Sequence, residues 1–119
     1  MKGDYMKLII AIVQPEELPD IKEELLKRKI YKFTVSSAKG QGKEIPVQEV
    51  YRGISHEISL LTKIRLEIAV NDDYVDNAVE AITAVAKKPD NKGRGKIFVL
   101  PIEQCIRIRT DEKGPEAIG

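Results

Sequence analysis

Five stretches of the chain carry hydrophobic patterns that are typical of β-strands. Residues 6–13 (MKLIIAIV) form a continuous aliphatic run, which predicts a buried strand. Apolar and polar residues alternate over residues 31–37 and 58–70, so each segment predicts a strand with one buried face. Two shorter runs, residues 96–101 (KIFVLP) and 105–110 (CIRIRT), predict the last strands.

Two further segments have the spacing of amphipathic helices. In residues 15–29 the acidic side chains come first and the basic ones last, as the helix dipole favours. The apolar face expected for this helix consists of Leu18, Ile21, Leu25 and Leu26. A second helix follows the candidate caps at residues 71–73, with an expected apolar stripe of Val75, Ala78, Val79, Ile82, Val85 and Ala86.

The order of these elements predicts an α+β fold. Two split βαβ units, followed by a short C-terminal strand, make a ferredoxin-like βαββαβ sandwich with both helices on one face of an antiparallel sheet. The other face would present Lys63, Arg65 and Glu67, together with the arginines of residues 105–110. We therefore expect other subunits to pack on that second face.

The predicted elements leave two loops inside a single domain that spans residues 1–119. The first loop, residues 39–57, contains three glycines and one proline and has no sustained period. A connection this long inside a small domain is uncommon and is usually functional, although a plain flexible linker is the alternative. The second loop covers residues 87–95, and residues 110–119 form a polar tail.

Composition excludes several classes of protein. The 119 residues carry 20 Lys and Arg against 19 Asp and Glu, so no overall field favours nucleic acid or an anionic membrane. One Cys and one His build neither a disulfide framework nor a structural zinc site. No apolar run approaches the ~20 residues of a membrane span, and residues 1–5 are too polar for a signal peptide. We therefore expect a cytoplasmic protein whose residues 1–5 are an N-terminal extension.

A glycine-rich turn carries the first candidate binding chemistry. Gly93, Arg94, Gly95 and Lys96 stand immediately before a predicted strand. Glycines let backbone N–H groups approach an oxyanion, and the lysine adds a positive charge, so the turn suits phosphate. The spacing is not that of a P-loop, and an ordinary turn is the alternative interpretation.

Other basic and glycine-containing elements add to this turn. Arg107 and Arg109 are two residues apart on an expected strand, so both would point to one face with side chains ~7 Å apart. Their guanidinium groups suit phosphate oxygens, with a solvated edge strand as the alternative. Lys63 either pairs with an anion or extends to solvent. Together with the turn at residues 40–42, these elements suit a nucleotide polyphosphate.

The sequence offers little for catalysis. His56 is the one imidazole and Cys105 the one thiol, and they lie in different elements. No serine has the context of a nucleophile elbow. The acidic residues belong mostly to helix faces and caps, so we expect a regulatory protein rather than an enzyme.

Several motifs together resemble the PII signal-transduction proteins in order and spacing. They are MKLIIAIVQPEEL, EVYRG, KIRLEIAVNDD, GRGKIFVLP and CIRIRT, and the resemblance extends from residue 6 to about 112. It implies a ferredoxin-like homotrimer with ATP or ADP bound in each cleft between subunits, and Mg²⁺ and 2-oxoglutarate as further ligands. It also implies a long T-loop, here residues 39–57, that contacts an ammonium transporter or a nitrogen-metabolism enzyme. Contact with a membrane would occur only through the transporter.

The resemblance implies roles for individual residues. Lys63 matches a lysine near the phosphates and the 2-oxoglutarate carboxylate, and residues 87–95 match the B-loop. Tyr51, Arg52 and Gly53 match the partner-contacting YRG motif, whose arginine enters the mouth of the channel or otherwise stabilises the loop base. The implied nucleotide-binding set is Thr34, Gly40, Gly42, Lys43, Lys63, Gly93, Arg94, Gly95, Lys96, Arg107 and Arg109.

The T-loop departs from the family pattern in three ways. His56 stands where the family has its uridylylated tyrosine, so we expect no tyrosyl uridylylation there. Lys43-Glu44 replaces the usual arginine-glutamine pair, whose glutamine helps to hold Mg²⁺. Glu44 could still bind the metal, but a carboxylate at ~4 Å from a dicarboxylate effector costs about 1–4 kcal/mol. The middle of the loop, EIPVQEV, lacks the family's usual basic and glycine-rich run.

Three hypotheses therefore remain open at this point. The first is a nucleotide-sensing regulator of nitrogen assimilation. The second is a divergent PII-like sensor of ATP and ADP that regulates a carbon, metal or nitrogenase-related target without responding to 2-oxoglutarate. The third is a ferredoxin-like enzyme or metal-binding protein that uses His56 and nearby acids.

Overall fold

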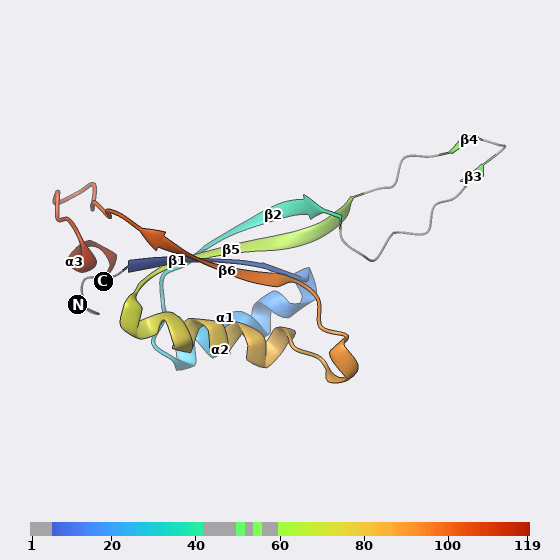
Figure 1. The fold of residues 1–119 in the computed structure, drawn as a ribbon, viewed down its shortest axis with the longest axis horizontal. Coiled ribbons are helices and arrows are strands. Elements are labelled where there is room, and N and C mark those ends of the chain that lie inside the picture. Colours follow the sequence, from blue (N-terminus) through green and yellow to red (C-terminus); the bar gives the residue numbers. More distant parts are fainter. Residues whose placement is uncertain (1–5, 42–49, 52–53, 56–59) are drawn as a thin grey trace.

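In the computed structural model, residues 6–41, 50–51, 54–55 and 60–119 are described. A four-stranded antiparallel sheet has the order β2-β5-β1-β6 (Figure 1). Its strands are β1 (Met6–Val13), β2 (Thr34–Gly40), β5 (Leu61–Asn71) and β6 (Lys96–Ile102). The remaining elements are η2 (Pro15–Glu17), α1 (Leu18–Lys27), β3 (Val50–Tyr51), β4 (Ile54–Ser55), η3 (Asp72–Tyr74), α2 (Val75–Ala86), η4 (Pro89–Asn91) and α3 (Pro115–Ile118).

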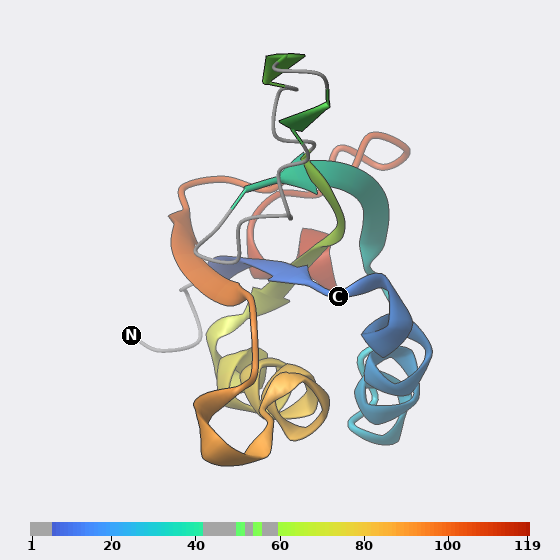
Figure 2. The same cartoon turned by 90° about the vertical axis from the view of Figure 1, so that its right-hand side faces the viewer.

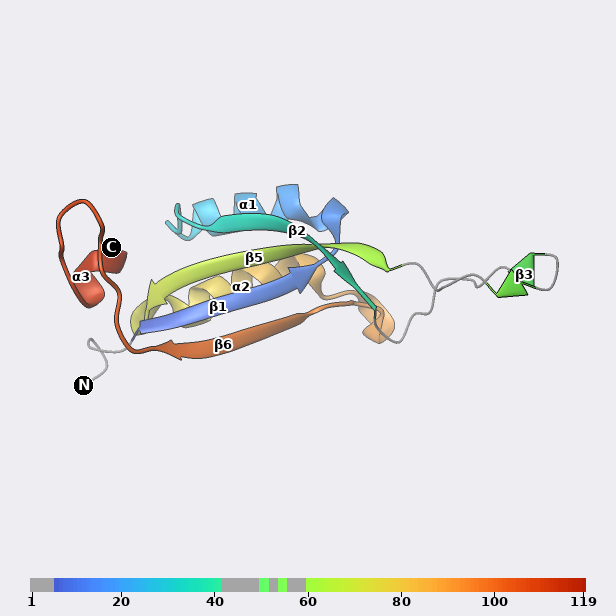
Figure 3. The same ribbon diagram turned by 90° about the horizontal axis from the view of Figure 1, so that it is seen from above.

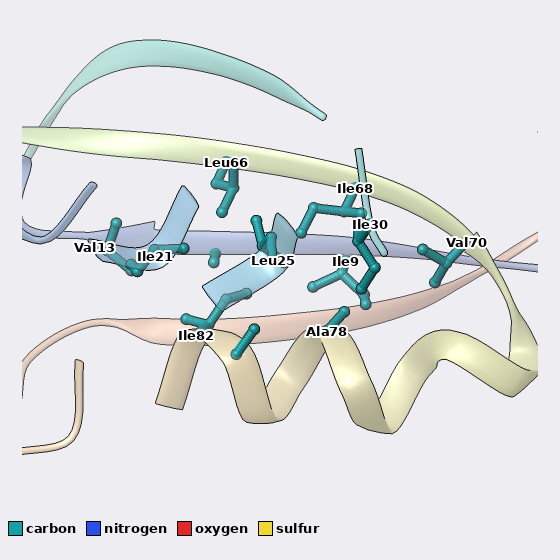
Figure 4. Packing of buried hydrophobic residues seen from close by; sticks show 12 residues of the cluster. Ile9, Val13, Ile21, Leu25, Ile30, Leu66, Ile68, Val70, Ala78 and Ile82 are labelled. Atoms are coloured by element: carbon teal, nitrogen blue, oxygen red, sulfur yellow. The ribbon is translucent and has the colours of Figure 1, made fainter. Parts of the chain in front are cut away.

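Both long helices lie side by side against one face of the sheet, and this arrangement confirms the ferredoxin-like prediction (Figure 2). Alternate residues of β1, which are Ile9, Ala11 and Val13, face the helices and are almost fully buried. Across the register, Ile9 lies opposite Ile68 and Ala11 opposite Leu66. Ile21, Leu25, Ala78 and Ile82 from the helices complete an entirely aliphatic core (Figure 4).

α1 ends in a Schellman motif that directs the chain back to the core. The N–H of Ile30 donates to the Leu25 carbonyl at 2.9 Å, and Lys29 N–H donates to Leu26. Lys29 takes the left-handed conformation, with φ of 62°, at the position where glycine is usual. Ile30 and Leu25 are both buried, whereas Leu26 is 50% exposed, so its predicted place on the buried face is wrong.

β2 begins three residues later than the alternation predicted. Ile30 is held in the core, so the chain joins the sheet only at Thr34, which lies opposite Glu67. Tyr31 precedes the strand and is 65% exposed, although the pattern placed it on the buried face. Phe33 does pack against the core. At its other end β2 continues to Gly40, into the segment that we expected to be loop.

Figure 3 shows the strands from above, on the face of the sheet opposite the helices. This second face has an apolar half and a charged half. Leu8, Ile10 and Ile12 of β1 point to this face, opposite Leu100, Phe98 and Lys96 of β6. Phe98 is 48% exposed. On β5 the same face carries Arg65 and Glu67, which form an ion pair at 3.3 Å. The face is therefore more apolar than the sequence indicated, and its apolar part lies over β1 and β6.

The predicted C-terminal strand, residues 105–110, does not form. A single bridge joins Ile106 to Lys113, and the chain turns back because Asp111 adopts a φ of 61°. The N–H of Gly114 donates to the Cys105 carbonyl at 2.9 Å. The expected polar tail contains the short helix α3, and Asn71 Nδ2 at the end of β5 donates to the Pro115 carbonyl at 3.2 Å.

Candidate functional site

The B-loop, residues 87–95, folds into a compact turn between α2 and β6 because two glycines lie against neighbouring backbone. A Cβ on Gly93 would lie 2.7 Å from the Ala86 carbonyl oxygen and 3.0 Å from the Lys88 nitrogen. Gly95 has a φ of 106°, and a Cβ there would collide with the carbonyl oxygen of Ile12. Both positions therefore require glycine, as expected of backbone that other groups approach closely.

A cavity of about 420 Å³ lies beside this glycine turn (residues 93–96). Arg94 and Lys96 are exposed at its edge, which gives the opening a positive character. The end of β1 and the last turn of α2 supply an apolar floor. The lining residues are Ile12, Val13, Ile82, Thr83, Ala86, Lys87, Lys88, Gly93, Arg94, Gly95, Lys96 and Ile97.

Lys63 and Gly40 lie at this same end of the sheet, on the other side of β1. Gly40 pairs with Leu61 and Ala38 with Lys63 across β2 and β5. Lys63 is only 8% exposed, and a Cβ on Gly40 would contact its Cγ at 3.4 Å. β5 and β6 flank β1, so their ends lie roughly 10 Å apart. The structure therefore gathers Gly40, Lys63 and the glycine turn at one end of the sheet.

Thr34, Arg107 and Arg109 are not part of this group within one protomer. Thr34 is the first residue of β2 and Gly40 the last. The seven-residue β6 places the C-terminal segment (residues 105–119) roughly 20 Å from the glycine turn. Arg107 and Arg109 also fail to form the expected pair on one strand face, because the chain turns there instead of extending.

Arg107 is instead bonded to its own C-terminal segment. Its Nη1 donates to Glu112 Oε1 at 2.8 Å, and its Nη2 donates to the Glu116 carbonyl at 3.1 Å. The same Glu112 oxygen accepts from the Thr110 hydroxyl at 2.8 Å. Arg109 is exposed. The guanidinium that we expected to meet phosphate thus already holds a carboxylate and a carbonyl oxygen.

Several predicted residues lie outside the described part of the chain. They include His56, so the structure tests neither the role that the third hypothesis gave to His56 nor the expected loss of uridylylation. Tyr51 belongs to the short ladder between β3 and β4, where it lies opposite Ile54. The other predicted residues outside the described ranges are Gly42, Lys43, Glu44, Arg52 and Gly53.

The structure also shows an ion pair at the B-loop that the sequence did not indicate, between the buried Glu17 and the Lys88 side chain, which is 45% exposed. Glu17 is only 5% exposed, and its Oε2 lies 3.3 Å from Lys88 Nζ. Its Oε1 accepts from the Gln14 N–H at 2.9 Å, while Lys88 Nζ also donates to the Val85 carbonyl at 2.6 Å. Each residue looked like an ordinary surface charge of its own element, so only the tertiary packing identifies the pair.

Within residues 6–41, 50–51, 54–55 and 60–119, no three His, Cys, Asp or Glu side chains gather where they could hold a metal ion. In the same part of the chain, no helix is long and apolar enough to cross a membrane.

Comparisons with known proteins agree with this architecture. The family described as nitrogen regulatory protein P-II matches residues 6–112. The chain is 49% identical over 114 residues to nitrogen regulatory protein GlnK1 of Methanosarcina mazei, covering 95% of this chain and 97% of that protein. It is 40% identical to nitrogen regulatory protein P-II 2 of Methanothermobacter thermautotrophicus, covering 96% and 98%.

A solved structure gives the same result. The PII protein of Arabidopsis thaliana bound to citrate superposes with a TM-score of 0.73 at 32% identity, covering 95% of this chain and 89% of that one. The relatives are named as regulators of nitrogen metabolism, which makes a signalling role, and not catalysis, the shared function. The chain therefore belongs to the P-II family of nitrogen regulatory proteins.

Proposed function

We propose that this protein senses adenine nucleotides, with ATP or ADP bound at the end of the sheet that carries the glycine turn, Gly40 and Lys63. The observation that carries the proposal is the tight backbone approach at Gly93 and Gly95 beside a cavity of about 420 Å³. Such backbone suits phosphate oxygens, and Lys96 adds a cation at the start of β6. The citrate-bound PII relative supports a site for a multiply charged anion in this fold.

The proposed site is completed by a neighbouring protomer in a homotrimer. Thr34, Arg107 and Arg109 lie too far from the glycine turn of their own chain to serve it. The apolar half of the second sheet face, with Phe98 and Leu100 about half exposed, is the kind of surface that a subunit covers. A neighbour packed there would bring its own arginines to this chain's cavity.

Mg²⁺ and 2-oxoglutarate are proposed as further ligands of the nucleotide-bound state. Lys63 would attract the dicarboxylate, and Glu44 would contribute an oxygen ligand to the metal. The negative charge of Glu44 favours the alternative, a sensor of the ATP/ADP ratio that lacks a 2-oxoglutarate response. Titrating 2-oxoglutarate in the presence of Mg-ATP separates the two, because a saturable signal excludes the alternative.

The proposed output is contact between the T-loop and a cytoplasmic surface. Tyr51, Arg52 and Gly53 would contact an ammonium transporter or a nitrogen-assimilation enzyme, and the protein would reach the membrane only through the transporter. The near balance of charges argues against a nucleic-acid partner. The bound nucleotide would set the conformation of the loop, and His56 would leave no tyrosine for modification at that position.

Calorimetry with ATP and ADP tests the nucleotide proposal. We expect saturable, mutually competitive binding of both nucleotides to the wild-type protein. Lys96→Ala removes a cation from the edge of the cavity, which lowers affinity by about tenfold or more at low salt. Lys22→Ala, on the exposed face of α1, is the matched control and leaves affinity unchanged. If neither nucleotide binds the wild-type protein, the proposed function is wrong.

A further inference from the structure

The Glu17–Lys88 pair joins the B-loop to the start of α1, and its Lys88 also lines the cavity beside the glycine turn. Glu17 ends η2 just before α1, and Lys88 is the second residue after α2. The Glu17 carboxylate uses one oxygen for the Gln14 N–H and the other for Lys88 Nζ. Because Lys88 also donates to the Val85 carbonyl, a single ammonium group joins the start of α1 to the end of α2.

This junction is in direct mechanical contact with the glycine turn. A Cβ on Gly93 would lie 3.0 Å from the Lys88 backbone nitrogen, so the backbone of residue 93 rests on the backbone of residue 88. Lys88 itself lines the cavity of about 420 Å³. A displacement of Lys88 would therefore be passed to Gly93 with little attenuation, because close-packed backbone has no free space to absorb it.

The surroundings of the Glu17–Lys88 pair indicate that the pair fixes the geometry of the B-loop, in addition to contributing charge. A second cavity of about 270 Å³ lies between α1 and the B-loop, lined by Glu16 of η2, Asp20 of α1 and the loop cations Lys92 and Arg94. Glu17 is the buried member of this acidic group, and it forms the ion pair with Lys88. A buried carboxylate with both oxygens engaged has one preferred geometry, which suits it to fix a loop.

We propose that Glu17 is a positioning residue of the nucleotide site, holding Lys88 and through it the glycine turn in the geometry that receives phosphate. This inference rests on the proposed nucleotide binding. Glu17 touches no ligand in this account and acts through Lys88. The geometry of the B-loop would therefore depend on the position of the start of α1, although α1 is not part of the loop.

The test uses an isosteric change that separates the two contacts of Glu17. Glu17→Gln keeps an oxygen for the Gln14 N–H and removes the charge that holds Lys88. Lys88→Met removes the same pair from the other side, and Lys88→Arg restores a cation that can reach Glu17. Glu24→Gln, which breaks partly exposed ion pairs further along α1, is the matched control.

Affinity for ATP is measured by calorimetry on each full-length variant, with thermal unfolding as a check on folding. We expect Glu17→Gln and Lys88→Met each to weaken ATP binding by about five- to tenfold, with the double variant no weaker than the worse single one. Lys88→Arg should recover most of the affinity, and Glu24→Gln should retain all of it.

The outcomes are distinguishable from failure of the proposed function. If wild-type protein binds no nucleotide, the proposed function itself fails. If wild-type protein binds ATP but Glu17→Gln and Lys88→Met bind it equally well, the positioning role is wrong. The positioning role is also wrong if the losses of ATP affinity in the two single variants add in the double variant, because additive losses mean that the two residues act independently. It is wrong as well if Lys88→Arg recovers no affinity.

Discussion

The two ends of the sheet differ in how closely neighbouring groups approach the backbone and in what their cationic side chains contact. At the glycine-turn end, Gly95 occupies a φ of 106° against the Ile12 carbonyl, and the cations of the turn line a cavity. At the C-terminal end, Lys29 and Asp111 have left-handed φ values without being glycine, and Arg107 is bonded to Glu112. Gly95 thus stands where a neighbouring group leaves no space, whereas Gly114 at the C-terminal end has a positive φ with nothing within 4 Å of an added Cβ.

This difference suggests which end is built in advance for a ligand. The glycine turn has its geometry set by contacts within the chain, so a ligand finds it preformed. Arg107 would have to exchange a carboxylate and a carbonyl oxygen for phosphate before it could take part. The C-terminal end would therefore complete the site at a cost, after subunit contact or nucleotide entry, whereas the glycine-turn end would bind first.

The largest expected effect comes from filling the space at the glycine-turn end. Gly95→Ala adds a methyl group against the Ile12 carbonyl at a positive φ, so we expect a loss of about 2–4 kcal/mol in the free energy of unfolding. Gly114→Ala is the matched control, because its φ is 79° but nothing lies within 4 Å of the added atom. Its φ of 79° and ψ of −155° alone should cost about 1–3 kcal/mol. Urea unfolding at one protein concentration measures both.

Equal losses in the free energy of unfolding for the two alanine variants would contradict this difference between the two ends of the sheet. Such a result would mean that backbone angle alone, and not close approach, requires glycine at residue 95.

The next effect concerns the bonds of Arg107. Arg107→Met keeps the apolar stem and removes the contacts with Glu112 and the Glu116 carbonyl, so the C-terminal segment should open locally. Since the ion pair is partly exposed, the stability cost is about 1 kcal/mol or less. Amide hydrogen exchange should accelerate at Gly114 and Ala117, whose N–H groups donate within this segment.

Arg109→Met provides the control for that measurement, because Arg109 is exposed. Unchanged exchange at Gly114 in the Arg107 variant would mean that the guanidinium does not hold the segment.

A smaller effect of opposite sign is expected at Lys29. Lys29→Gly relieves a left-handed lysine in the Schellman motif at the end of α1, and part of that gain is offset by the greater freedom of glycine in the unfolded chain. We expect the free energy of unfolding to rise by about 0.5–1 kcal/mol. Lys29→Ala, which removes the side chain but keeps the strain, should leave stability nearly unchanged in the same urea titration.

The smallest effect is a pH dependence on α1. Hydrogen bonds from Arg28 and Lys27 hold the pKa of Glu24 below its ordinary value of 4.5. A carboxyl whose pKa is lowered by folding stabilises the protein above its unfolded pKa, and this contribution is lost as pH falls through the folded pKa. Glu24→Gln should therefore lower the melting temperature slightly at pH 7 and not at pH 3. A difference that persists at pH 3 would contradict this origin.

Local patterns predicted the central strands and both helices because each has a clear period and a buried face. β1, α2 and β6 begin and end close to the predicted positions, and Ile21 and Leu25 are buried as expected. β2 was misplaced because Ile30 is drawn into the core by the Schellman turn, a tertiary effect. The alternation of Ile106 and Ile108 predicted a strand, but pairing needs a neighbour and the chain supplies only Lys113.

The candidate site was predictable where backbone chemistry is local. The glycines of residues 93–96 predict from the sequence alone that other backbone groups approach this turn closely. The structure adds that Lys63 lies at the same end of the sheet. The Glu17–Lys88 pair was not predictable, because two ordinary charges meet only after α1 and α2 pack. The separation of Arg107 and Arg109 from the glycine turn was equally hidden, since it depends on the length and direction of β6.

In the proposed homotrimer, the glycine turn of one protomer is completed by the arginines of another. Mixed oligomers test it directly, with Lys96→Ala and Arg109→Ala chains co-expressed under different tags and purified as heteromers. If the arginine acts in trans, each purified heterotrimer pairs one intact turn with one intact arginine, which restores ATP binding at about a third of its sites. Calorimetry should then find this fraction at wild-type affinity, whereas the two homomeric variants bind weakly. If the heteromers contain no sites of wild-type affinity, the arginine does not complete the site of a neighbouring protomer.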